Sequence, residues 1–158
     1  MIKPLTVYKA SAGSGKTFTL AVEYIKLLVE NPQQYRNILA VTFTNKATEE
    51  MKMRILSQLY GIWNQYPDSD QYTKKICAEL NCSVEFLRGR VNTALKLLIH
   101  NYSFFRIETI DSFFQSVLRN LAHELDLTPN LRIELNDDEV EERAVDKMIE
   151  ELTPNKDI

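Results

Sequence analysis

The sequence predicts an α/β fold in which helices flank a parallel sheet, and three observations carry this prediction. Residues 10–17 form a loop with two glycines that lies between a short apolar stretch and an amphipathic segment. Residues 38–41 are apolar without interruption, as expected of a parallel strand covered on both faces. A helical segment follows each stretch, and consecutive strand–loop–helix units are typical of α/β proteins.

The loop at residues 10–17 resembles the phosphate-binding pattern G-x-x-x-x-G-K-[ST] and departs from it at Ala10. Gly13 and Gly15 let the loop curl so that successive N–H groups converge on an anion. Lys16 is expected to reach the outer phosphates, and Thr17 to offer its hydroxyl to Mg²⁺; both are candidate catalytic residues. A glycine–serine turn with a chance lysine is the alternative. The predicted site for ATP and Mg²⁺ consists of Ala10, Ser11, Ala12, Gly13, Ser14, Gly15, Lys16 and Thr17.

The first helix is expected at residues 18–30, after a short strand at residues 5–8. Its apolar side chains recur at helical spacing, and the positive end of its dipole would add to the attraction for phosphate. Asn31 and Pro32 are expected to end this helix, because proline disfavours a helical conformation in the residue before it.

The second strand–helix unit places Thr42, Phe43, Thr44 and Asn45 at the end of its strand, on the sheet edge expected to carry the phosphate loop. Thr44 or Asn45 is expected to cap a helix that runs to about residue 63. Hydroxyl and amide side chains suit phosphate contacts, and an exposed Phe43 would stack on a base. Helix capping with Phe43 buried explains the same residues equally well, so both interpretations stand.

The rest of the chain alternates between helical and extended patterns. Residues 66–101 are helical and are interpreted as an insertion between residues 1–65 and 102–152, which form the α/β domain; residues 153–158 are a tail. A strand at 104–110 precedes a helix at 111–125, and an exposed edge strand at 131–135 precedes a helix at 137–152. The helix at 111–125 is expected to turn four apolar residues inward: Phe114, Val117, Leu118 and Leu121.

Composition indicates a globular protein: 44% of the 158 residues are hydrophobic and 26% are charged. The apolar stretches are too short to span a membrane. The net charge of −3 combines +3 in residues 1–130 with −6 in residues 131–158, so the larger part is mildly basic. Cys77 and Cys82 match neither a disulfide framework nor a zinc spacing, and indicate buried or incidental thiols in a reducing compartment, the cytoplasm. His100 and His123 are interpreted as solvated or capping residues.

Three segments carry a family resemblance: ASAGSGKTFTL at residues 10–20, ILAVTFTNKATEEMKMRI at 38–55 and TIDSFFQSVL at 109–118. They resemble superfamily 1 DNA helicases of the UvrD/Rep type, and more closely the RecB/AddA nuclease-helicase subunits. The resemblance implies a RecA-like P-loop domain of an ATP-dependent enzyme that translocates on single-stranded DNA in recombination and repair. Its implied partners are the other domains of a longer chain and a further component of a nuclease complex. It places along the DNA path Thr42, Phe43, Thr44, Asn45, Thr109 and Ser112.

At two positions this chain departs from UvrD-type sequences and resembles the RecB/AddA branch. Asp111 replaces a histidine of the UvrD type, and Phe18 replaces an arginine that touches adenine. Hydrolysis also needs an acidic pair after a buried strand and arginines from a second domain. Asp137, Asp138 and Glu139 follow an alternating stretch, and are interpreted as a cluster at a helix N-terminus. The chain is therefore expected to be an incomplete domain that binds nucleotide without hydrolysing it.

Two other functions compete with this interpretation. In a small P-loop kinase, Lys16 would serve phosphoryl transfer to a small acceptor, but the sequence shows no arginine-rich lid. In a non-enzymatic binding module, the phosphate loop would act only as a switch.

Overall fold

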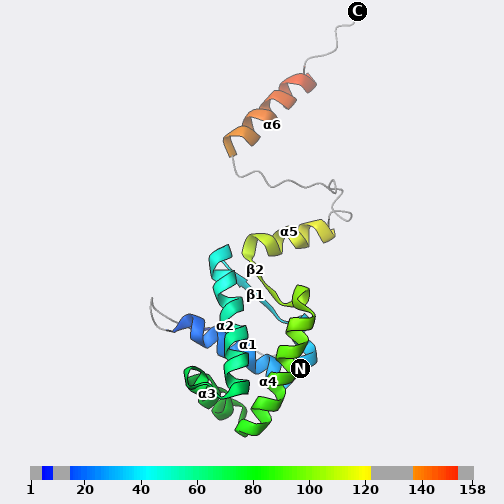
Figure 1. The fold of residues 1–158 in the computed structure, drawn as a ribbon. Coiled ribbons are helices and arrows are strands. Elements are labelled where there is room, and N and C mark those ends of the chain that lie inside the picture. Colours follow the sequence, from blue (N-terminus) through cyan, green and yellow to red (C-terminus); the bar gives the residue numbers. More distant parts are fainter. Residues whose placement is uncertain (1–4, 9–14, 122–136, 153–158) are drawn as a thin grey trace, which may run out of the picture. The chain divides into compact units, whose positions relative to one another are not determined.

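The computed structural model describes residues 5–8, 15–121 and 137–152 (Figure 1). It divides into two compact units, residues 1–114 and 115–158, and the boundary falls within α5. The strands are β1 (Leu39–Thr42) and β2 (Arg106–Thr109). The α-helices are α1 (Lys16–Glu30), α2 (Asn45–Asn64), α3 (Asp70–Leu80), α4 (Val84–His100), α5 (Ile110–Leu121) and α6 (Asp137–Leu152). Three short 3₁₀ helices are η1 (Pro32–Asn37), η2 (Pro67–Ser69) and η3 (Tyr102–Phe104).

The sheet of the described residues consists of β1 and β2, which are parallel as the sequence predicts. The expected strand at residues 5–8 is wrong: this segment has no regular structure, and Leu5 is 91% exposed. A strand needs a neighbour for its backbone hydrogen bonds, and neither β1 nor β2 pairs with this segment. The expectation that β1 is covered on both faces is also wrong, because Leu39 and Val41 are exposed while Ala40 is buried.

Local side-chain chemistry sets the C-terminal end of α1 and the N-terminal end of α2, as expected. Asn31 and Pro32 follow the last residue of α1, and the Asn31 side-chain oxygen accepts the Gln33 N–H at 3.1 Å. Of the two candidate caps for α2, Thr44 is the one used, because its hydroxyl accepts the Ala47 N–H at 3.1 Å.

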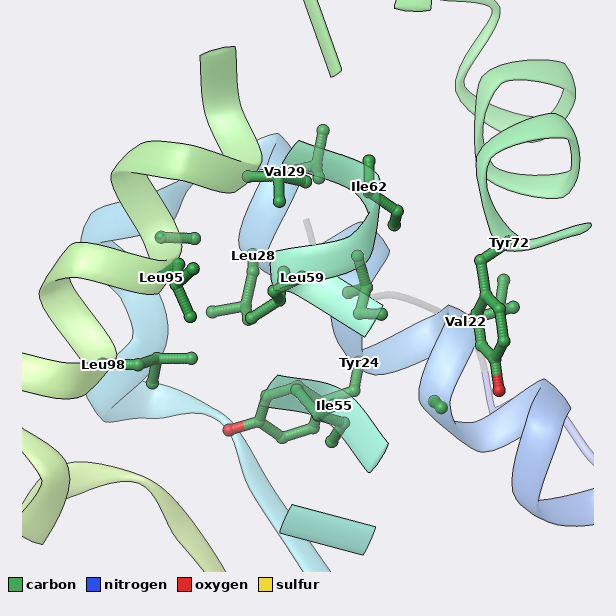
Figure 2. Close-up of a cluster of buried hydrophobic side chains, with 14 of the residues drawn as sticks. Val22, Tyr24, Leu28, Val29, Ile55, Leu59, Ile62, Tyr72, Leu95 and Leu98 are labelled. Atoms are coloured by element: carbon green, nitrogen blue, oxygen red, sulfur yellow. The ribbon is translucent and has the colours of Figure 1, made fainter. Parts of the chain in front are cut away.

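Helices α1, α2 and α4 build the hydrophobic core. Figure 2 shows Leu28 of α1, Leu59 of α2 and Leu98 of α4 pointing into the same space, and all three are fully buried. Helix α3 packs against the start of α1, where the Tyr72 and Phe18 ring centroids lie 4.5 Å apart. Residues 66–101 are helical as expected, and they share this core; their assignment as an insertion stays a prediction.

Helix α5 shows less burial than the sequence indicates. The expectation that the apolar face of α5 turns inward is wrong for the described residues: Phe114 and Leu121 are exposed, and Val117 and Leu118 are only partly buried. Helix α6 spans residues 137–152 as predicted, and its described side chains are exposed. The expected edge strand at 131–135 lies outside the described residues.

The packing gives a prediction for stability. Ile55 lies fully buried on α2, whereas Ile99 on α4 is 60% exposed. Removing one methylene by Ile55→Val is expected to lower the free energy of unfolding by about 0.5–1.5 kcal/mol. Ile99→Val, the same chemical change at the surface, is expected to stay within about 0.5 kcal/mol of the unchanged chain. Urea unfolding of both variants measures the difference, and equal destabilisation would contradict the assignment of Ile55 to the core.

Candidate nucleotide and DNA site

The end of the predicted phosphate loop is an exposed helix start. Gly15 has a φ of 79°, which is favourable only for glycine, and its carbonyl accepts the Thr19 N–H at 2.9 Å. Lys16 and Thr17 form the exposed first turn of α1. Within the described residues, no side chain caps this turn and no acidic residue lies in it. The first N–H groups of a helix have no acceptor within the helix, so this end of α1 favours an anion.

The carboxyl ends of β1 and β2 lie side by side, because Thr42 pairs with Thr109 in the parallel register. Each of these threonines makes a short hydroxyl contact. Thr42 Oγ1 lies 2.7 Å from Thr48 Oγ1, and Thr109 Oγ1 lies 2.8 Å from Ser112 Oγ. Thr109 Oγ1 also accepts the Ser112 N–H at 3.2 Å. The structure therefore brings the expected DNA-binding hydroxyls of two distant segments to one edge of the sheet.

Phe43 and Asn45 extend this edge toward solvent. Phe43 is 87% exposed, which excludes the interpretation in which this ring is buried in the core. Asn45 is the first residue of α2 and is exposed. The adjacent Thr44 already uses its hydroxyl for the helix cap, so helix capping and an exposed aromatic ring occur together.

Thr48 is a member of this group that the sequence patterns did not single out. Its hydroxyl donates to the Thr44 carbonyl at 3.2 Å and contacts Thr42, which links the end of β1 to the first turn of α2. The spacing of Thr48 could have indicated this contact, since a threonine four residues after a helix cap lies within reach of the carbonyl of the cap residue.

A polar pocket of about 420 Å³ lies along α1 and α3, beside the segment that precedes the phosphate loop. Lys26 joins the two helices, with Nζ 2.9 Å from a Glu23 oxygen and 2.6 Å from a Glu79 oxygen. Hydrogen bonds from Lys26 and Lys75 lower the pKa of the Glu79 carboxyl. The Tyr8 hydroxyl donates to Glu23 at 3.1 Å, and this hydrogen bond raises the Tyr8 pKa. No sequence motif indicated this pocket.

Several expected site residues fall outside the described part of the chain. Residues 10–14 of the phosphate loop and His123 lie there, and nothing is described of the Asp137, Asp138 and Glu139 side chains. His100 is the exposed last residue of α4, near a helix end as expected. Within the described ranges, no group of three or more His, Cys, Asp or Glu could hold a metal ion. No helix described is long and apolar enough to cross a membrane.

The comparisons with known proteins agree with the family resemblance of the sequence. Relatives named as ATP-dependent helicase/nuclease subunits are 37% identical over 126 residues in Thermoanaerobacter sp. (strain X514) and 34% over 126 residues in Clostridium novyi (strain NT). Each of these matches covers 78% of this chain and 8% of the relative. The protein of the same name in Bacillus cytotoxicus is 32% identical over 146 residues, or 90% of this chain and 10% of the relative.

The chain thus spans about a tenth of the length of these curated relatives. No solved structure gives a match. The family model of the UvrD/REP helicase N-terminal domain matches residues 2–158, nearly the whole chain. The chain therefore belongs to the UvrD/REP helicase N-terminal domain family.

Proposed function

We propose that this chain is the ATP-binding part of an ATP-dependent DNA helicase, or helicase-nuclease, that moves along single-stranded DNA in recombination and repair. The observation that carries the proposal is the exposed start of α1. There a left-handed glycine leads directly into Lys16 and Thr17, with no acidic side chain in the described first turn. Membership in a helicase family favours this function over a small P-loop kinase.

The residues of this turn fit a nucleotide and its Mg²⁺. Triphosphate carries several negative charges, and the N-terminal end of α1 offers N–H groups together with the positive end of the helix dipole. The Lys16 ammonium would hold the outer phosphates, and the Thr17 hydroxyl would serve as an oxygen ligand of Mg²⁺. The bound Mg²⁺ would neutralise phosphate charge. Both side chains are exposed, so neither needs to leave a core contact to meet a ligand.

The proposed DNA path follows the carboxyl ends of β1 and β2. Thr42 and Ser112 supply hydroxyls that suit phosphate oxygens, and the neighbouring Phe43 ring supplies a stacking surface. Thr109 is buried and supports this path by holding Ser112 through its hydroxyl. Base stacking is tolerant of sequence, as a translocating enzyme requires, because every base offers a π face. Other domains of a longer chain and a further component of a nuclease complex are the proposed protein partners.

Unwinding by the full-length protein tests the proposed function. A duplex with a single-stranded tail is expected to be separated when ATP and Mg²⁺ are present, and to stay paired with a non-hydrolysable ATP analogue. ATP-dependent transfer of phosphate to a small acceptor, without strand separation, would overturn the proposal in favour of a kinase.

Phe43→Ala in the full-length protein is expected to weaken single-stranded DNA binding by about 1–3 kcal/mol, with little dependence on base sequence. The stability of the fold should change little, because the ring is exposed. Fluorescence anisotropy with labelled oligonucleotides measures the affinity.

Two control variants separate stacking from other effects. Phe43→Trp keeps an aromatic surface and is expected to retain binding. Phe86→Ala removes another exposed ring, on α4, and is expected to leave DNA affinity unchanged. A folded Phe43→Ala protein with normal affinity for single-stranded DNA would show that the DNA does not stack on Phe43.

A further inference from the structure

The end of α3 brings the two cysteines of the chain together. Asn81, just after the helix, has φ 48° and ψ 48°, in the left-handed region. The Cys82 N–H then donates to the Cys77 carbonyl at 3.1 Å. A hydrogen bond of this kind is typical of a Schellman ending, in which the residue after the left-handed one lies over the last turn of the helix. The side chains of the two residues whose backbones it joins often touch. Apolar residues commonly make this contact, but here both positions carry thiols.

The surroundings leave both thiols partly accessible. Cys77 and Cys82 are half-buried at the border of the hydrophobic core, and both are free. Burial raises the pKa of the Cys77 thiol, and the neighbouring Cys82 and the negative charge of Glu85 raise it further. The influence of Cys82 on Cys77 is consistent with the contact that the backbone geometry imposes.

We propose that Cys77 and Cys82 form a dithiol modification site that reacts with low-molecular-weight disulfides and closes into an intramolecular disulfide. The thiolate of one cysteine attacks a sulfur of the small disulfide, forms a mixed disulfide and expels one small thiol. The second cysteine then attacks the protein sulfur of the mixed disulfide and expels the other small thiol. The two cysteines lose two electrons and two protons, and the small disulfide is reduced to two thiols.

The single variants separate the two steps. Cys77→Ser and Cys82→Ser are each expected to stop at the mixed disulfide with glutathione, because the second thiol that closes the bond is missing.

Redox titration with oxidised and reduced glutathione tests the site, with peptide mass spectrometry to locate the bond. In the native chain, the disulfide between Cys77 and Cys82 is expected to form at a value of [GSSG]/[GSH]² roughly tenfold lower than in urea, where GSSG and GSH are oxidised and reduced glutathione. The difference arises because the folded backbone already holds the two residues together.

A matched control moves one thiol by a single position. The double substitution Cys77→Ala with Ala78→Cys keeps the composition and almost the same spacing, but places the thiol on an exposed face of α3. In urea this variant should form the disulfide as readily as the natural sequence. In its native state it should form the disulfide no more readily than it does in urea. The proposal is overturned if the native chain forms only mixed disulfides, or if native and unfolded chains close the bond equally well.

Discussion

Lys16→Ala is expected to weaken ATP and ADP binding by about 1.5–3 kcal/mol, or roughly 10- to 150-fold in Kd, while the chain stays folded. Lys16 lies in the exposed first turn of α1, outside the hydrophobic core, and alanine is a good helix former. The substitution therefore removes the proposed charge-assisted contact with phosphate without opening a cavity. Titration of a fluorescent nucleotide measures both affinities.

The control for this experiment is Lys96→Ala. Lys96 is an exposed lysine on α4, so its replacement changes the net charge by the same amount at a site remote in sequence from the phosphate loop. Nucleotide affinity is expected to be unchanged in this variant. Equal losses in the two variants would indicate a general effect of net charge, and equal affinities for Lys16→Ala and the natural sequence would refute the role assigned to Lys16.

The sequence predicted most helices well because their signals are local. The cap at Thr44, and the Asn31–Pro32 pair after α1, act within three residues of the helix ends that they define. Helix α6 also has the predicted bounds. The strand predicted at residues 5–8 is absent, because a strand depends on a distant neighbour and apolar character does not show whether that neighbour is present. The same reason explains the apolar residues of α5, such as Phe114, which are exposed in the described structure.

The candidate site likewise has features that local sequence predicts and features that depend on distant residues. The turn at Gly15 could be predicted from its motif, and so could the parallel sheet, but the pairing of Thr42 with Thr109 came only from the structure. Sequence reasoning could not choose between a buried and an exposed Phe43, because burial depends on what packs over the end of β1. The ion-pair bridge from Lys26 to Glu79 joins two helices about fifty residues apart in sequence, so no local pattern indicates it.

ATP hydrolysis requires more than the binding of nucleotide and Mg²⁺. In the transition state, arginine stabilises the charge of the transferred phosphoryl group, and an acidic or amide side chain aligns the attacking water. Arg90 donates to the Val29 carbonyl at 2.7 Å, and Arg106 lies 2.7 Å from a Glu108 oxygen. Arg90 thus ties α4 to the end of α1, whereas Arg106 pairs at the surface within its own strand, and using either guanidinium group in catalysis would break these contacts.

The largest effect is therefore expected for turnover. The 158-residue chain should bind nucleotide weakly, yet hydrolyse ATP roughly 10³- to 10⁵-fold more slowly than the full-length protein with single-stranded DNA, the range that a missing arginine alone can account for. Release of inorganic phosphate, measured with and without single-stranded DNA, tests this. The full-length Lys16→Ala protein serves as a background for contaminating ATPases. Robust DNA-stimulated turnover by the 158 residues would mean that Asp137, Asp138 or another acid of this chain is catalytic, because the roles proposed for Lys16 and Thr17, holding phosphate and Mg²⁺, do not include aligning the attacking water.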